Sequence, residues 1–405
     1  MMSDNPAHST KDVRRWPEGV GMVYLAMSPW DSMWKNRHQL MSRFATEMPV
    51  LYVEPWQRLK RLRRDFPGVM PFLRSGKDAN VTEISPNLCV FHSPPSLAVS
   101  GSILLERMTK IRWLNGVRKA ADGMGITRPI LWLSLPEMRF AVDKFGEAMS
   151  IYHVVDEYAG YTGQDESKRE ALWAEEQQLL DLADLTIVVS PELASSKSAN
   201  GRSVHIVENA VDFQAFEHAM KVAHLPEELR EIPQPRLGYC GLIGKRLDLE
   251  LLLTMGRQHP EWSIVLVGKV DDRGCREKID ALEEMANVHF IGRQDVKDVP
   301  RFISSFDIGL LPYELNIETK NISPLKLFEY IAMGKPVVST DIPAARRHDS
   351  VVLVSGEADE FIQNCAAMLA SAPDESHFNS LLDYAAVNTW DKRIDQISDL
   401  LVERL

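Results

Sequence analysis

The feature that most constrains this chain is a regular alternation of short apolar runs with longer amphipathic stretches. Runs such as VGMVYLAMS (20–28) and PVLYVEP (49–55) contain many β-branched and aromatic residues, which is typical of buried parallel strands. The stretches between such runs, notably 166–182, have helical patterns. Strands that alternate with helices predict an α/β fold with parallel sheets and right-handed crossovers.

The alternation occurs in two series, separated by the charged, proline-containing stretch HLPEELREIPQP (224–235). A chain of 405 residues is too long for one hydrophobic core and is a natural size for two. We therefore expect two doubly wound, Rossmann-like domains facing a cleft, with C-terminal helices packing back on the N-terminal domain. The predicted divisions are a disordered tail (1–18), an N-terminal domain (19–212), a linker (213–235), a C-terminal domain (236–385) and a C-terminal helix (386–405).

Composition and charge exclude several classes of protein. The formal net charge of −11 argues against general nucleic-acid binding, because a phosphate backbone requires an excess of cations. The four cysteines show no metal-ligand spacing and no disulfide framework, which favours a reducing compartment. The first residues contain no apolar secretory region, and no run approaches the roughly 20 apolar residues of a membrane span. We expect a cytoplasmic protein, with contact to a membrane surface left open.

The stretch SPLKLFEYIAMGKPVVST (323–340) predicts a helix, a turn and a buried strand. Ser323 is expected to be the N-cap and Pro324 the first helical residue, where its missing N–H has no cost. Gly334 is expected just past the helix end, because glycine adopts the left-handed conformation that ends helices. Lys326 and Glu329 are three residues apart and therefore share one helix face.

Several segments around this unit carry a resemblance to a known family. NVHFIGRQDVKDVPRFISSFDIGLLPY, the 323–340 stretch, and the earlier ENAVD and IVLVGK together resemble the nucleotide-sugar domain of GT-B-fold glycosyltransferases, over most of 203–345. NRHQLMSRFATEMPVLYVEP and IYHVVDEYAGY, in the N-terminal half, look like glycosyltransferases that build bacterial surface polysaccharides, such as the teichuronic acid and xanthan enzymes. The resemblance implies that the C-terminal domain binds a nucleotide sugar and the N-terminal domain an acceptor.

The resemblance also implies a role for Glu329. In the family, the matching glutamate accepts hydrogen bonds from the ribose hydroxyls of the donor. Retaining members carry a Glu-x7-Glu signature whose first glutamate touches the transferred sugar, but that position holds Asn321 here. The identity of the sugar and the choice between retention and inversion of the anomeric centre therefore stay open.

Sugar transfer develops negative charge on the leaving diphosphate, and this chain has no Asp-x-Asp triplet to hold a metal against it. A helix N-terminus with a cation is the alternative, because its free N–H groups and positive dipole end attract anions. We expect the amides of Leu325 and Lys326 and the Lys326 ammonium to meet the diphosphate, so that no metal or cofactor is required. In the alternative interpretation, Lys326 and Glu329 form a surface ion pair. Ser323 is expected to cap the helix, and its hydroxyl is also a candidate for contact with a donor phosphate.

Two further features are candidates for donor binding. Gly241 follows a predicted strand and would permit close backbone approach to a ligand, although a tight turn explains it equally well. Lys245 or Arg246 would supply a second phosphate contact, or would form an ordinary solvated basic turn.

Asp156 is the candidate catalytic base, because YHVVDEY places it where a strand ends in the N-terminal half. It matches the acidic residue that the xanthan-type enzymes use to take the proton from the acceptor hydroxyl. The alternative is a carboxylate that caps the following turn. His153, earlier in the same strand, is expected to be a core histidine.

The segment WQRLKRLRR (56–64) combines five cations with apolar residues at three-residue intervals. Such a segment can lie on anionic lipid, although a solvated basic loop is the common alternative. The cations of this candidate membrane or acceptor contact are Arg58, Lys60, Arg61, Arg63 and Arg64.

These features predict a metal-independent glycosyltransferase that moves a sugar, expected to be uridine-linked, from a nucleotide donor to a lipid-linked or cell-surface glycan. A nucleotide-sugar 2-epimerase on the same fold is one alternative, and it needs no acceptor. A non-catalytic protein that binds sugar nucleotides is the other, because Asn321 replaces a signature glutamate.

Overall fold

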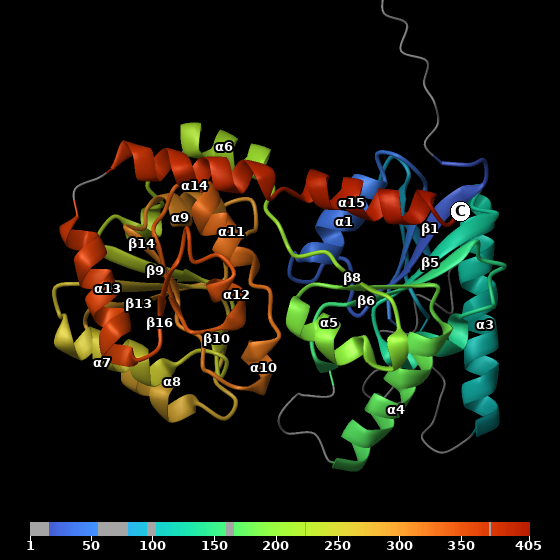
Figure 1. Cartoon of the computed structure of the whole chain (residues 1–405), viewed down its shortest axis with the longest axis horizontal. Coiled ribbons are helices and arrows are strands. Elements are labelled where there is room, and N and C mark those ends of the chain that lie inside the picture. The colour runs from blue at the N-terminus through green and yellow to red at the C-terminus, as the bar shows by residue number, and fades with distance from the viewer. Residues whose placement is uncertain (1–15, 56–79, 95–102, 159–165, 223, 372–373) are drawn as a thin grey trace, which may run out of the picture.

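The computed structural model describes residues 16–55, 80–94, 103–158, 166–222, 224–371 and 374–405, and these residues form two α/β domains side by side (Figure 1). The N-terminal domain is built on an eight-stranded sheet in the order β3-β4-β2-β1-β5-β6-β7-β8, in which only β3 is antiparallel to its neighbour. Its strands are β1 Val20–Leu25, β2 Val50–Val53, β3 Val81–Ser85, β4 Leu88–Phe91, β5 Arg128–Leu133, β6 Met149–Val154, β7 Leu185–Val188 and β8 Val204–Ile206. Its helices are α1 Asn36–Phe44, α3 Ile103–Gly123, α4 Glu166–Leu182 and α5 Pro191–Lys197.

The C-terminal domain is built on a six-stranded parallel sheet in the order β13-β11-β9-β14-β15-β16. Its strands are β9 Arg236–Cys240, β11 Ser263–Val267, β13 Val288–Gly292, β14 Ile308–Leu311, β15 Val337–Thr340 and β16 Leu353–Ser355, and β10 Ile243–Gly244 pairs separately with β12 Val270–Asp271. The helices that accompany it are α6 Phe213–Val222, α7 Leu249–Gln258, α8 Arg276–Glu283, α9 Val299–Ser304, α10 Ile317–Lys320, α11 Leu325–Ala332, α12 Pro343–Arg346, α13 Ala358–Ala370 and α14 Glu375–Val387. The predicted pair of doubly wound domains is confirmed.

The chain passes between the domains twice, and the two passages lie against each other. The Val211 carbonyl accepts from the Trp390 amide at 3.1 Å, and the Val211 amide donates to the Asn388 carbonyl at 3.1 Å. After the second passage, α15 (Trp390–Val402) packs Trp390, Ile394 and Leu401 into the core of the N-terminal domain. Figure 1 shows α15 beside α1. The prediction that a C-terminal helix packs back on the N-terminal domain is therefore correct.

Two predicted divisions differ from the structure. Residues 213–235 are not a free linker, because Phe216, Leu229 and Ile232 are buried in the core of the C-terminal domain. The predicted tail also extends too far: Trp16 is buried and donates to a carboxylate oxygen of Glu47 at 2.9 Å. In both segments isolated apolar residues are buried in a domain core. The polar residues around them made the segments resemble a linker and a tail.

Candidate functional site

Lys326 lies in the first turn of α11, where its ammonium is enclosed by two tyrosines. Its Nζ donates to the Tyr313 hydroxyl at 3.0 Å and lies 4.8 Å from the centre of the Tyr239 ring. Burial acts to lower the pKa of Lys326, but Tyr239 and Tyr313 more than offset this and raise it above its ordinary value. The side chain therefore carries a fixed positive charge beside the helix N-terminus.

Gly241 makes the space that Lys326 occupies. It follows β9 with a φ of +153°, and a Cβ at this position would lie 2.9 Å from both Cε and Nζ of Lys326. Gly268, with a φ of +149°, lies so close that its own Cβ would meet the Gly241 carbonyl. Gly241 is therefore in close contact with Lys326 and Gly268, and its approach to a ligand stays a prediction.

Glu329 lies one turn after Lys326 and is half-buried. Burial raises the pKa of its carboxyl group to about 6, and the charge of Lys326 partly counteracts this. Among the described residues, no side chain or amide donates a hydrogen bond to this carboxylate. A half-buried acceptor of this kind, next to a fixed cation, is suited to bind hydroxyl groups of a ligand.

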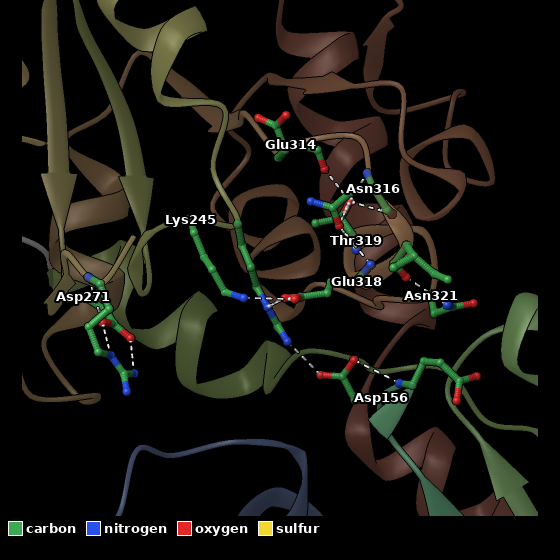
Figure 2. A network of polar contacts seen from close by, with 12 residues as sticks. Asp156, Lys245, Asp271, Glu314, Asn316, Glu318, Thr319 and Asn321 are labelled. Carbon is green, nitrogen blue, oxygen red and sulfur yellow. Dashed lines mark hydrogen bonds and ion pairs between the residues drawn. The ribbon is translucent and has the colours of Figure 1, made fainter. Parts of the chain in front are cut away.

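A chain of ion pairs connects the C-terminal domain to Asp156 of the N-terminal domain (Figure 2). Glu318, on α10, is buried; its carboxylate accepts from Lys245 Nζ at 3.0 Å and lies 3.5 Å from Arg246 Nε. Arg246 Nη2 continues to Asp156 Oδ2 at 3.2 Å, while Asp156 Oδ1 accepts from the Glu157 amide at 3.0 Å. The predicted donor-side cations and the predicted base thus belong to one network.

The loop before α11 is held by the N-terminal domain through its backbone. Ser190 Oγ donates to the Asn321 carbonyl at 3.2 Å, and Asn209 Nδ2 donates to the Ser323 carbonyl at 2.6 Å. The Asn321 side chain turns back to donate to the Ile317 carbonyl. This loop therefore places the N-terminus of α11 directly at the boundary between the domains.

One local prediction here is wrong. Ser323 is not the N-cap of α11, because Pro324 is still extended (φ −73°, ψ 120°) and occupies the cap position itself. The helix begins at Leu325, and within the described residues the amides of Leu325 and Lys326 donate to no protein acceptor. The predicted end is correct, since Gly334 follows the helix with a φ of +63°.

A buried ion-pair cluster supports the turn that carries Asp156. Lys197 Nζ lies 2.7 Å from Glu157 and 2.7 Å from Glu176, and the Tyr152 hydroxyl donates to Glu176 at 2.9 Å. His153, in β6, is buried against Trp132, and burial lowers its pKa to about 4. It is therefore neutral, as expected of a core histidine.

The start of α1 and the residue before it add two cations that the sequence did not single out. Arg37 is 4% exposed and bonds the Tyr52 hydroxyl at 3.1 Å, but it has no acidic partner among the described residues. Lys35, nearby, has a lowered pKa because of burial and the neighbouring charges of Arg37, Arg246 and Lys326, which Asp156 partly offsets. Lys35 and Arg37 thus bring positive charge from the N-terminal domain to the same network.

The structure brings Lys326, Gly241 and Glu329 together, and joins Lys245 to Asp156 through Arg246 and Glu318. Glu318, Lys35 and Arg37 were missed, because no motif or spacing marks them. The basic segment with Arg58, Lys60, Arg61, Arg63 and Arg64 lies outside the described residues. No helix in the described parts of the chain has the length and apolarity needed to cross a bilayer.

Sequence and structure comparisons agree on the type of protein. Residues 235–371 match the family described as glycosyl transferases group 1. A Bacillus subtilis (strain 168) protein described as teichuronic acid biosynthesis glycosyltransferase TuaH is 29% identical over 287 residues, which are 67% of this chain and 71% of that protein.

Solved structures share the fold at low identity. Sucrose-phosphate synthase from Thermosynechococcus elongatus superposes with a TM-score of 0.66 at 15% identity, covering 95% of this chain and 96% of that one. Anabaena HepE, solved in complex with UDP and glucose, gives 0.65 at 13% identity, with 94% and 99% coverage. The group 1 match and the TuaH relative support a glycosyltransferase, and the chain has the GT-B fold of these solved enzymes.

Proposed function

We propose that this protein transfers a sugar from a uridine-linked nucleotide donor to a hydroxyl group of a lipid-linked or cell-surface glycan, without a metal ion. The observation that carries the donor site is the pair Lys326 and Glu329 on one face of α11, beside a helix N-terminus whose first amides are available. HepE was solved with UDP and glucose, and the E. coli trehalose-6-phosphate enzyme with UDP-2-fluoro glucose, which favours a uridine donor. The relative in teichuronic acid biosynthesis favours a surface-glycan acceptor.

In this proposal the donor's diphosphate binds at the N-terminus of α11. The amides of Leu325 and Lys326 and the Lys326 ammonium neutralise the charge that grows there when the bond to the sugar breaks. Lys245 and Arg246 add positive charge from the turn after β10. The ionised Glu329 carboxylate accepts hydrogen bonds from the two ribose hydroxyls.

Asp156 acts as the general base once the donor is bound. In the free protein its Oδ2 is occupied by the hydrogen bond from Arg246. When the diphosphate attracts Arg246, Asp156 becomes available to take the proton of the acceptor hydroxyl. That oxygen then attacks the anomeric carbon as the bond to the diphosphate breaks, and this direct displacement inverts the anomeric centre.

Calorimetry with UDP and GDP tests the donor site. We expect UDP to bind the wild type, and Glu329→Ala to weaken this binding by about 1.5–3 kcal/mol, the range for hydrogen bonds to a charged group. Glu283→Ala, an exposed glutamate on α8, is the matched control and should bind normally. Unchanged UDP affinity in Glu329→Ala would contradict the assignment.

Product analysis separates the proposal from its alternatives. We expect sugar transfer that persists in excess chelator and requires an acceptor. An epimerised sugar nucleotide, formed with donor alone, would identify an epimerase. Donor binding without turnover on any glycan acceptor would identify a non-catalytic binding protein, and activity lost to chelator but restored by magnesium or manganese would overturn metal independence.

A further inference from the structure

Helix α3 presents an exposed apolar stripe on the outer side of the N-terminal domain. Leu104, Met108 and Ile111 are 67%, 51% and 48% exposed. Their spacing of four and three residues places them on one face of the helix. Exposed apolar residues are common when they occur singly, but three in a row on one helix face require an explanation.

Cations line both sides of this stripe. At 100° per residue, Arg107 and Arg118 lie on one side of the apolar residues, and Arg112 and Lys119 lie on the other. All four are exposed. Arg107 and Arg112 have no acidic partner among the described residues. Helix α3 has five Lys or Arg residues and two acidic ones, whereas the whole chain has a net charge of −11.

The opposite face fixes the helix to the domain. Trp113, Val117 and Ala121 are buried in the N-terminal core, and Trp113 Nε1 donates to Ser93 Oγ at 2.7 Å. These residues belong to the second half of α3, and the exposed stripe lies in its first half. Figure 1 shows α3 at the edge of the N-terminal domain that faces away from the C-terminal domain.

From this arrangement we infer that α3 is a docking helix for an anionic membrane, with Leu104, Met108 and Ile111 inserted among the lipid head groups and Arg107 and Arg112 on their phosphates. A helix with an apolar face flanked by cations lies in the plane of the interface rather than across the bilayer. The charges complement anionic lipid locally, although the protein as a whole would be repelled. A symmetric contact with a second copy is disfavoured, because it would bring the same arginines toward each other.

The inference rests on the proposed function, because docking to a membrane is useful when the acceptor is linked to a lipid in that membrane. It does not depend on the basic segment at 56–64. The contact would hold the N-terminal, acceptor-binding domain at the bilayer and leave the C-terminal domain in contact with the aqueous donor.

Sedimentation of the full chain with phosphatidylcholine–phosphatidylglycerol vesicles tests the inference, with pure phosphatidylcholine vesicles as the neutral comparison. We expect binding to the anionic vesicles and weak or no binding to the neutral ones. The triple variant Leu104→Ser, Met108→Ser, Ile111→Ser should abolish binding. Arg107→Gln with Arg112→Gln should weaken it about thirtyfold, which corresponds to roughly 1 kcal/mol for each cation.

Matched control variants remove the same kinds of side chain, exposed apolar residues and exposed cations, from helices other than α3. Val222→Ser, Val387→Ser and Val402→Ser remove three exposed apolar side chains from other helices. Arg276→Gln with Lys278→Gln removes two exposed cations from α8. Both control variants should bind anionic vesicles like the wild type, and every variant should keep its melting temperature and UDP affinity.

Three results would overturn the inference: wild-type protein that ignores anionic vesicles at low salt, α3 variants that bind as tightly as the wild type, or a wild-type dimer that the triple serine variant converts to monomers. Failure of the proposed function would give a different result. The wild-type protein would still bind vesicles, but it would not bind the donor or would not transfer sugar to a water-soluble acceptor.

Discussion

Burial raises the pKa of Glu329 to about 6, so this carboxyl group changes charge in the mildly acidic range. Its ionised form accepts hydrogen bonds from ribose hydroxyls on both oxygens and more strongly than the protonated form. We therefore expect UDP affinity to weaken as the pH falls from 7.5 to 5, with the main loss near pH 6. Calorimetry across this range measures it. Glu329→Gln should bind more weakly at pH 7.5 and show a flatter profile, whereas a pH-independent wild type would contradict the assignment.

Glu329 should also lower the free energy of unfolding. A carboxyl whose pKa rises from its ordinary 4.5 to about 6 on folding destabilises the native state wherever it is ionised, which is above pH 6. The cost shrinks between pH 6 and 4.5 and is absent below 4.5. Glu329→Gln should therefore be more stable than the wild type by about 1–2 kcal/mol at pH 8, with the difference vanishing near pH 4. Urea unfolding at both pH values measures this, and Glu283→Gln should show no such difference.

Asp156 can be tested separately from donor binding. Asp156→Asn keeps the shape of the side chain but removes its basicity, so turnover should fall by roughly 10²–10⁴ while UDP affinity changes little. Both quantities must be measured on one preparation, because a folding defect would lower both. Near-normal turnover, or a product that retains the donor's anomeric configuration, would show that another group takes the proton.

At the scale of the element, the turn after β6 depends on buried charge. Lys197 is 3% exposed, and its Nζ donates hydrogen bonds to the carboxylates of Glu157 and Glu176. Lys197→Met would leave two carboxylates close together without a cation, so we expect a loss of about 3–5 kcal/mol in the free energy of unfolding. Denaturant unfolding measures it. Lys221→Met, at an exposed ion pair on α6, should change stability by less than about 0.5 kcal/mol.

Individual elements also show what the sequence could and could not predict. Helix α4 (Glu166–Leu182) and the end of α11 at Gly334 were predicted correctly, because periodicity and a left-handed glycine are local signals. Lys326 and Glu329 were predicted to share one helix because they are three residues apart, and both lie on α11. Glu318 was not, because α10 is a single turn and its partner Lys245 is 73 residues away. Its role depends on pairings that only the folded chain creates.

At the scale of the molecule, Arg347 ties the domains together. Its guanidinium bonds Glu192 at 2.9 Å and Glu208 at 3.0 Å, both on the N-terminal domain. We expect Arg347→Met to loosen the relative position of the domains, seen as a larger radius of gyration in solution scattering without UDP. Arg346→Met is the matched control, because Arg346 is exposed and pairs with Asp341 of its own domain. Equal scattering from the two variants would contradict this role.

The hydrogen bonds from Ser190 and Asn209 to the loop before α11 have a consequence for how such an enzyme can change its donor. Both bonds end on carbonyl oxygens, of Asn321 and Ser323, so they do not depend on which side chains the loop carries. Substitutions at 321 or 323 can therefore change the side chains of this loop while the attachment of the loop to the other domain survives. In the proposed function, where the donor binds at the N-terminus of α11, position 321 can thus be varied to test donor specificity without loss of this contact between the domains.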